Sequence, residues 1–455
     1  MVPGVNGKIL RVNLSSRQIS VEQPEESLYR RYIGGAGFVS YYLLKEVPPG
    51  IDPLSPENKL IFALGLMTGM PLPGAGRNSF GAKSPLTMGF AKSEVGGWCG
   101  WELKRAGFDT MIVEGKAEHP VYSWVHDGQA DIRDASQFWG KTVLESHEAI
   151  AAELGDKLVR SAMIGPAGEN MARMACIIGD MRNAAGRGGL GAVMGSKNLK
   201  GIMLRGHKAP QVADPAKLLE LAKWMNNNYG SVNIGLLSKS LHDVGTGDAA
   251  MMHASNQIGN LPVRNWSDGS FEDVDKITAT VLKDTIRVGM EACPACQVRC
   301  KKQVEFDGPY KVDRRSGGPE YETLATMGSL CGVNDLKAIS KANELCSLYS
   351  LDTISTGAVI AFAMECFEKE IIGPRDTGGL DLRFGNAEAM LEAIELIAHR
   401  RGIGDILAEG TRIAAQKIGR GAEEFAMHVK GLEIPMHEPR LKQGMDALVL
   451  SAIRG

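Results

Sequence analysis

Apolar and polar positions alternate through much of the chain up to about residue 206, which is the pattern of half-buried β-strands. Residues 8–14 alternate, a turn follows at 15–17, and the alternation returns through Ile19 and Val21, so a hairpin is predicted. The pattern recurs in a second predicted hairpin, formed by residues 120–124 and 130–133. Two helices are expected to interrupt the strands, near 39–46 and over 143–154.

Beyond residue 206 the pattern becomes helical. Asp214-Pro215 pairs an N-cap with a proline at the first helical position, which predicts a helix over 216–226. Asp335 is predicted to cap a helix over 336–348. Three more helices are predicted over 353–369, 386–399 and 406–418. The fold class is therefore α+β: a β-rich domain over 1–207, a helical domain over 208–423, and the start of a third, helical domain over 424–455.

Composition narrows the function classes. A chain of 455 residues is too long for one compact core, and its 44% hydrophobic and 23% charged residues are typical of globular proteins. A net charge of -2 argues against nucleic-acid binding by global charge. The N-terminus lacks a signal pattern, and the longest apolar stretch, near 357–364, is too short to cross a bilayer. We expect a cytoplasmic protein without a membrane partner, whose eight cysteines are reduced thiols or metal ligands.

The densest chemistry is a run of three cysteines, Cys293, Cys296 and Cys300, spaced Cys-x₂-Cys-x₃-Cys. Thiolates this close together favour an iron–sulfur cluster, which usually takes four cysteines, so the run lacks one ligand. A zinc knuckle is the alternative. Basic residues flank the run and would stabilise an anionic cluster; they are Arg299, Lys301 and Lys302.

Glycine-rich loops, at 34–37, 74–78, 94–97 and 184–191, suggest a second cofactor. Backbone amides beside Arg77, Arg182 and Arg187 would bind phosphates, which indicates a large phosphate-bearing cofactor. Ordinary turns in a β-rich domain are the alternative.

Other candidate residues carry weaker signals. Glu320 and Glu322, in Gly-Pro-Glu-Tyr-Glu after the cysteines, would move protons or belong to a solvated loop. Nine histidines form no closely spaced pair. The other cysteines are expected to be small buried side chains; they are Cys99, Cys176, Cys331, Cys346 and Cys366.

The sequence resembles the aldehyde ferredoxin oxidoreductase family almost end to end. The runs that carry the resemblance are 7–15, 52–59, 83–87, 102–109, 164–170, 184–200 and 351–357. The resemblance implies a tungsten bis-pyranopterin on the N-terminal β-sheet domain, with the helices on its other side, and one [4Fe–4S] cluster. It also implies oxidation of small aldehydes to carboxylic acids, with electrons passing to ferredoxin or an iron–sulfur subunit, in a homo- or hetero-oligomer.

The resemblance assigns roles to the loops. Arg77 would link the cluster to a pterin, and Gly96 and Gly97 would cradle pterin phosphates together with Arg182, Asn183 and Ala184. A Mg²⁺ ion between the phosphates would take the backbone carbonyls of Glu94 and Ala184. This chain has Glu94 where many relatives have Asn, and a carboxylate there needs Mg²⁺ or an arginine to offset its charge. It also has Asn183 where relatives often have Arg.

The remaining implied roles lie in the helical half. Cys293, Cys296 and Cys300 would be cluster ligands, Glu322 a proton carrier near tungsten, and Asp352 a hydrogen-bond partner of a pterin ring.

The family's third domain continues beyond the stretch that matches 439–455. It supplies the tungsten-side histidine, a second pterin-binding signature and the fourth cluster cysteine, so these are expected to be missing from this sequence. Cys331, Cys346 or Cys366 would be the substitutes for the fourth cysteine, although their family counterparts do not bind the cluster. Two other functions remain open: a tungsten-containing benzoyl-CoA reductase-type subunit, or a truncated, inactive remnant.

Overall fold

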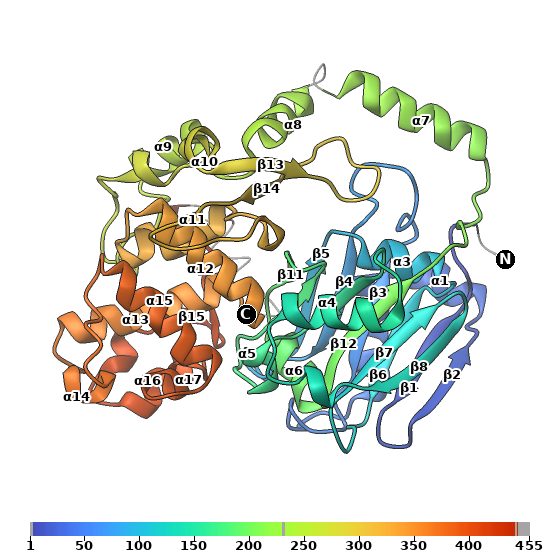
Figure 1. Ribbon diagram of the computed structural model, residues 1–455, viewed down its shortest axis with the longest axis horizontal. Coiled ribbons are helices and arrows are strands. Elements are labelled where there is room, and N and C mark those ends of the chain that lie inside the picture. Colours follow the sequence, from blue (N-terminus) through green and yellow to red (C-terminus); the bar gives the residue numbers. More distant parts are fainter. Residues whose placement is uncertain (1–2, 230–232, 442–443, 445–455) are drawn as a thin grey trace. The chain divides into compact units, whose positions relative to one another are not determined.

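The structure is a computed structural model that describes residues 3–229, 233–441 and 444, the side chains of 233–238 excepted. The chain forms two compact units (Figure 1). Unit 1 comprises Met1–Met171, Ala175–Lys239 and Ala292–Arg299, and unit 2 comprises Ala172–Met174, Ser240–Glu291 and Cys300–Gly455.

Unit 1 contains two six-stranded mixed sheets. The first has the order β2-β1-β6-β3-β4-β5, and its strands are β1 (Ile9–Asn13), β2 (Gln18–Glu22), β3 (Leu60–Leu64), β4 (Asn78–Lys83), β5 (Phe90–Val95) and β6 (Thr110–Glu114). β1 and β2 form the first predicted hairpin, which is confirmed, with Ile9 opposite Glu22. β1 and β6 run parallel, and the other pairs are antiparallel.

The second sheet has the order β11-β10-β9-β12-β7-β8. Its strands are β7 (Val121–His126), β8 (Gln129–Asp134), β9 (Arg160–Met163), β10 (Ile177–Gly179), β11 (Asn183–Ala185) and β12 (Leu199–Arg205). β7 and β8 form the second predicted hairpin, which is also confirmed.

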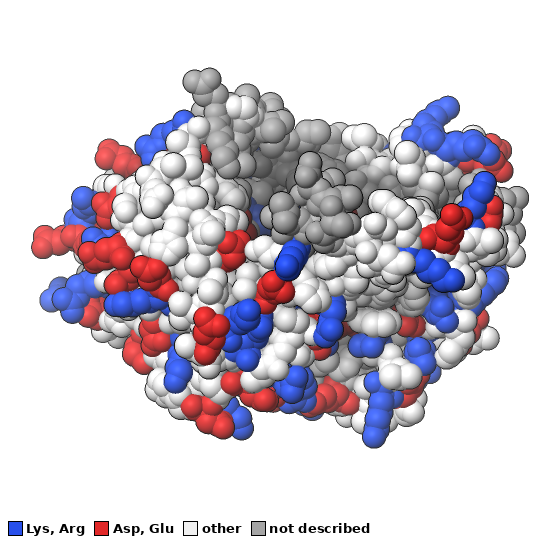
Figure 2. All heavy atoms as spheres, turned by 90° about the horizontal axis from the view of Figure 1, so that it is seen from above, with Lys and Arg blue, Asp and Glu red and all other residues white. Residues whose placement is uncertain are grey.

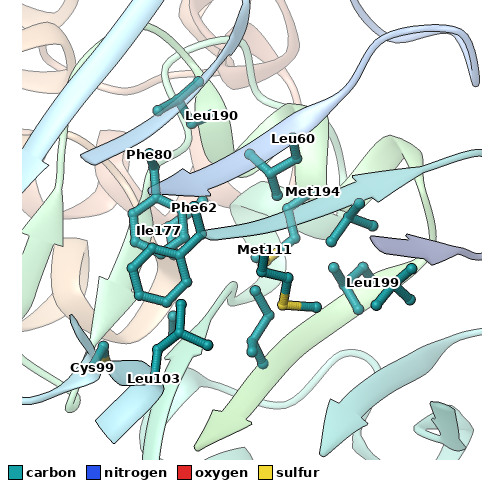
Figure 3. Packing of buried hydrophobic residues seen from close by; sticks show 14 of the residues in the cluster. Leu60, Phe62, Phe80, Cys99, Leu103, Met111, Ile177, Leu190, Met194 and Leu199 are labelled. Carbon is teal, nitrogen blue, oxygen red and sulfur yellow. The ribbon is translucent and has the colours of Figure 1, made fainter. Parts of the chain in front are cut away.

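One hydrophobic core joins residues from both sheets of unit 1 (Figure 3). Phe62 on β3 and Phe80 on β4 stack with ring centroids 4.2 Å apart. Met194 from a helix and Leu199 from β12 belong to the same cluster. The helices of this unit are α1 (Glu26–Tyr32), α2 (Ala36–Glu46), α3 (Cys99–Arg105), α4 (Val143–Leu154), α5 (Pro166–Glu169), α6 (Leu190–Ser196) and α7 (Pro215–Asn228). The two helices predicted in this half correspond to α2 and α4.

Unit 2 is mostly helical. After α8 (Asn233–Val244), which spans the division between the units, its helices are α9 (Ala249–Gln257), α10 (Ala279–Thr285), α11 (Tyr321–Met327), α12 (Leu336–Tyr349), α13 (Thr353–Glu368), α14 (Pro374–Thr377), α15 (Ala387–Ala398), α16 (Ile403–Leu407) and α17 (Thr411–Ile418). Two short hairpins accompany them: β13 (Arg287–Glu291) with β14 (Lys301–Val304), and β15 (His428–Val429) with β16 (Leu432–Glu433).

The predicted caps are present. Asp214 accepts a hydrogen bond from the Lys217 amide at 3.0 Å and starts α7, and Asp335 starts α12 in the same way. The single helix predicted over 406–418 is wrong, because the chain forms α16 and α17 with Gly410 at φ 82° between them. A left-handed φ cannot continue a right-handed helix.

The α+β class is confirmed. The compact units group the chain differently from the domains predicted from the sequence pattern, since Leu218 and Ala222 of α7 pack on Met70 and Leu72 of unit 1. The boundaries near 207 and 423 stay predictions. No helix in the described part of the chain has the length and apolarity to cross a membrane. Figure 2 shows acidic and basic side chains intermingled on the face that it displays.

Candidate functional site

Two glycine-rich loops of unit 1 lie against the first cysteine of the run. The Gly97 amide donates a hydrogen bond to Cys293 Sγ at 3.2 Å. A Cβ on Gly96 would come within 2.9 Å of the same sulfur, and one on Gly76 would lie 3.4 Å from Cys293 Cβ. Only glycine permits this approach of backbone to a thiol, and amide-to-sulfur hydrogen bonds are the contacts that stabilise a metal-bound thiolate.

Arg77 follows Gly76 directly. The backbone around it is fixed, because its amide donates to the Gly74 carbonyl at 3.2 Å and its carbonyl accepts from Thr68 Oγ1 at 2.8 Å. Its exposed guanidinium has no hydrogen-bond or ion-pair partner among the described residues. The residue next to the Gly76 contact with Cys293 thus carries a guanidinium that no described side chain neutralises, and an anion site needs such a group.

The loop that ends at Gly97 also meets the strand that carries Asn183 and Ala184. A Cβ on Gly97 would lie 2.6 Å from Asn183 Nδ2. Ala184 is exposed on β11, and the Arg182 amide donates to the Gly179 carbonyl at 3.1 Å in the turn before it. Gly96, Gly97 and Asn183 are thus brought together with Cys293 in unit 1, and their role toward a cofactor stays a prediction.

Glu94 lies on β5 in the same loop region, and its charge is offset by a lysine. Lys92 Nζ lies 2.9 Å from Glu94 Oε1, and Ser79 Oγ on β4 donates to the same oxygen at 2.7 Å. Positions two apart on a strand share a face, so β5 itself supplies the cation. The sequence leads us to expect Mg²⁺ or an arginine to offset the charge of Glu94. Within unit 1, Lys92 provides a positive charge beside it.

The eight cysteines fall into two classes. Cys293 and Cys296 are half-buried and Cys300 is exposed, whereas the five isolated cysteines are buried, as predicted. The Cys296 amide donates to the Cys293 carbonyl at 3.1 Å, which places these two in one turn. Among the described residues no three His, Cys, Asp or Glu side chains are close enough together to hold a metal ion. The role of Cys293, Cys296 and Cys300 as cluster ligands stays a prediction.

The candidates for a substitute fourth ligand are buried thiols of unit 2. Burial raises the pKa of Cys331 and Cys346 well above the ordinary thiol value, and it raises that of Cys366 to about 12. Metals bind the thiolate form, so a metal ion at any of these positions would have to displace a proton that burial retains.

Glu322 of unit 2 lies in the first turn of α11 and contacts a segment 114 residues further along. Its Oε2 accepts a hydrogen bond from the Met436 amide at 2.9 Å, and its Oε1 lies 3.3 Å from His437 Nε2. The His437 ring packs on Tyr321, with ring centroids 5.2 Å apart, and the Tyr321 hydroxyl donates to the Met436 carbonyl at 2.6 Å. The predicted proton carrier therefore has a histidine partner.

Sequence reasoning missed His437. Short-range spacing marks only histidines that have a partner nearby in the sequence, and the partner of His437, Glu322, is distant in the chain.

An ion pair between a buried lysine and a half-buried glutamate holds the start of α11. Lys302, 0% exposed, donates from Nζ to Glu320 Oε2 at 3.0 Å and to the Thr246 carbonyl at 3.0 Å. Burial alone would raise the pKa of Glu320, but Lys302 and Lys301 lower it to about 2. Lys302, predicted to lie beside the cluster, is thus committed to Glu320 and fixes the helix turn that carries Glu322.

Asp352 caps α13 in unit 2. Its two carboxylate oxygens accept from the amides of Ile354 and Ser355, both at 3.2 Å. This capping explains the residue structurally. Its contact with a pterin ring stays a prediction.

Comparisons with known proteins extend these observations. The family model described as "Aldehyde ferredoxin oxidoreductase, N-terminal domain" matches residues 9–206, and that described as "Aldehyde ferredoxin oxidoreductase, domains 2 & 3" matches 220–455. The tungsten-containing aldehyde ferredoxin oxidoreductase of Pyrococcus abyssi is 43% identical over 446 residues, which cover 97% of this chain and 72% of the relative. The enzyme of the same name from Pyrococcus horikoshii is 44% identical with the same coverage.

A solved structure agrees. The active site complex BamBC of benzoyl coenzyme A reductase, in complex with 1,5-dienoyl-CoA, superposes with a TM-score of 0.80 at 32% identity, covering 96% of this chain and 67% of that one. Both family models, the level of identity and the shared fold lead to one assignment. The chain belongs to the aldehyde ferredoxin oxidoreductase family and is an oxidoreductase.

Proposed function

We propose that this protein is a tungsten-dependent enzyme that oxidises aldehydes to carboxylic acids and passes the electrons through a [4Fe–4S] cluster to ferredoxin or to an iron–sulfur subunit. The observation that carries the proposal is the Gly96-Gly97 loop seated on Cys293. In this contact, backbone without side chains lies directly against a thiol that is a candidate cluster ligand. The naming of relatives as tungsten-containing aldehyde oxidoreductases supports the choice of reaction.

The residues of unit 1 fit a phosphate-bearing pterin cofactor. The loops leave no room for side chains at Gly96 and Gly97, and Arg77 presents a guanidinium without a partner in the described chain. Arg182, Asn183 and Ala184 would complete the cradle, and Mg²⁺ would take the carbonyls of Glu94 and Ala184. When bound, the tungstopterin supplies the two-electron redox chemistry.

Glu322 would transfer the protons that the reaction releases. Oxidation of an aldehyde with water yields a carboxylic acid, two protons and an electron pair. The Met436 amide fixes one oxygen of Glu322, and the other faces His437 Nε2, so a proton that arrives at Glu322 has an acceptor at hand. A positioned acid or base of this kind accelerates a reaction by about 10²–10⁴-fold.

The test is to purify the protein from cells grown with tungstate and to measure tungsten, iron and pterin per chain. Viologen-coupled oxidation of acetaldehyde and benzaldehyde follows on the same sample. We expect bound tungsten and iron and aldehyde-dependent viologen reduction. Protein that folds but contains neither metal and reduces no viologen would overturn the proposal.

The benzoyl-CoA reductase structure supports one alternative. In that case the chain would serve as the active subunit of a complex that reduces an aromatic thioester. Copurification with further iron–sulfur or flavin subunits, and reduction of benzoyl-CoA without aldehyde oxidation, would favour this alternative.

A further inference from the structure

A buried carboxylate lies behind the proposed cofactor loops of unit 1. Asp180, in the turn between β10 and β11, is 1% exposed. Its Oδ2 accepts a hydrogen bond from the Trp98 amide at 2.8 Å, and its own amide donates to the Ser161 carbonyl at 2.9 Å. Its Oδ1 has no hydrogen-bond partner among the described residues, although it is buried. A buried acceptor left unsatisfied is costly, so this oxygen of Asp180 does not stabilise the fold.

The turn around Asp180 is itself in a rare conformation. Asp180 and Met181 both have positive φ, 50° and 68°, without being glycine. Such a conformation is strained for a residue with a side chain, and it persists only where its surroundings hold it. This turn immediately precedes Asn183 and Ala184, the residues proposed to face the cofactor. The bonds of Asp180 connect this turn to Ser161 and Trp98, beyond the pairing of β10 with β11.

Trp98, the partner of Asp180, is also held by its neighbours. Trp98 directly follows Gly97, and the Arg160 guanidinium lies 4.8 Å from the centre of its ring. The next residue, Cys99, donates from Sγ to the Ser161 carbonyl at 3.0 Å, the same carbonyl that accepts from the Asp180 amide. One carbonyl on β9 and one carboxylate therefore tie the two loops together.

We propose that Asp180 is a positioning residue, which sets the spacing between the Gly96-Gly97 loop and the Asn183-Ala184 segment. Its side chain is too deeply buried to touch a cofactor, so it acts through the Trp98 amide. The spacing prearranges the backbone groups that would bind the pterin phosphates. The inference rests on the proposed function for its consequence, but the tether between the loops is testable without any cofactor.

Two substitutions separate the roles of the carboxylate. Asp180→Ala removes the acceptor, whereas Asp180→Asn keeps a side-chain oxygen for the Trp98 amide and removes the charge. Glu102→Ala is the matched control, because Glu102 is another buried carboxylate of unit 1 that accepts one backbone amide, that of Gly206 at 2.8 Å. The bond that Glu102→Ala removes, to Gly206, involves neither loop, whereas Glu102 itself lies on α3, which begins directly after Trp98.

The first measurement is amide hydrogen exchange of the segment around Trp98 in metal-free protein. We expect about tenfold faster exchange in Asp180→Ala, since a hydrogen bond to a charged group is worth roughly that factor or more. Asp180→Asn, which keeps a neutral acceptor, should show a smaller increase, and Glu102→Ala should show no change. The second is tungsten and pterin per folded chain after expression with tungstate. Here we expect at least a severalfold loss in Asp180→Ala only.

Unchanged exchange at Trp98 in Asp180→Ala would overturn the tether. Equal cofactor loss in Asp180→Ala and Glu102→Ala would show a general destabilisation and would overturn the positioning role. If wild-type protein takes up no tungsten, the proposed function fails, and the exchange comparison still decides whether Asp180 ties the loops.

Discussion

Glu94 of unit 1 and Glu322 of unit 2 are both candidate functional carboxylates, but their partners give them different tasks. Glu94 shares one oxygen with Lys92 and Ser79, so its charge is compensated on its own sheet face. Glu322 has a backbone amide on one oxygen and an ionisable ring beside the other. The first arrangement suits a residue that must not repel an anion, and the second suits one that exchanges protons.

Removing the compensating lysine should weaken cofactor binding. In Lys92→Met the Glu94 carboxylate would face the pterin phosphates uncompensated, and we expect several times less tungsten per folded chain. The double variant Lys92→Met with Glu94→Asn should recover most of it, because the repelling charge is gone. Metal analysis of the three proteins checks this. A double variant as poor as Lys92→Met would show that the lysine acts in some other way.

Glu322→Gln should lower kcat for aldehyde oxidation by about 10²-fold or more, with little change in KM. The amide keeps the shape of the side chain and an oxygen for the Met436 amide, but it cannot accept a proton. Steady-state kinetics with viologen as the acceptor measures the effect. Glu388→Gln, an exposed carboxylate that accepts from the Tyr310 hydroxyl, serves as the control and should retain full activity. Wild-type kcat in Glu322→Gln would remove this residue from the mechanism.

Helix α2 is attached to the first sheet by ion pairs at its C-terminal end. Glu46, its last residue, lies 2.7 Å from both Arg11 of β1 and Lys59, which precedes β3. A carboxylate at the end of a helix is disfavoured by the helix dipole, so these cations decide whether the end is stable. Burial works against ionisation, but Arg11 and Lys59 lower the pKa of Glu46 to about 2.

This pKa predicts an acid-dependent loss of stability. The folded protein keeps Glu46 ionised to lower pH than the unfolded chain does, so the stabilisation is complete above the ordinary value of 4.5 and disappears as the pH falls toward 2. It amounts to about 2–3 kcal/mol at most. Urea unfolding of wild type and Glu46→Gln should therefore differ most above pH 5 and converge near pH 2. A constant difference across that range would contradict the coupling.

The elements that the sequence predicted well are those with local causes. The hairpin of β1 and β2, and the helices that begin after Asp214 and Asp335, follow from alternation and from capping side chains next to them. The break at Gly410 was missed because periodicity continues across it, and only the backbone angle shows the change. Local signals therefore define most elements but not every end of a helix.

The candidate functional residues also differ in whether a local sequence signal marks them. The cysteine run and the glycine loops were visible as short motifs. The contact of Gly97 with Cys293 spans 196 residues, and that of Met436 with Glu322 spans 114, so neither could be derived from spacing. The contact of Asp180 could not be predicted from the sequence for the same reason, since its partner Trp98 lies 82 residues away.

Across the whole molecule, the cysteines differ in how accessible their thiols are to reagents and metals. Three lie in one accessible or half-buried run, and five are buried in hydrophobic surroundings in the two units. Burial raises the pKa of Cys99, Cys331, Cys346 and Cys366, which keeps them protonated at neutral pH. Alkylating reagents react with the thiolate, so burial and protonation protect the same side chains.

Alkylation of the metal-free native protein should therefore label Cys293, Cys296 and Cys300, and should spare the other five until the protein is unfolded. Because cluster assembly occupies thiolates, incubation with iron and sulfide before alkylation should protect the three cysteines of the run together. Mass spectrometry of the digested protein measures each site, and fully unfolded protein, in which all eight react, calibrates the yields. If only one of the three became protected, or if none did, the run would not act as a single ligand set. Rapid native labelling of Cys331 or Cys346 would contradict the packing of unit 2 instead, so the two parts of the structure are tested separately in one experiment.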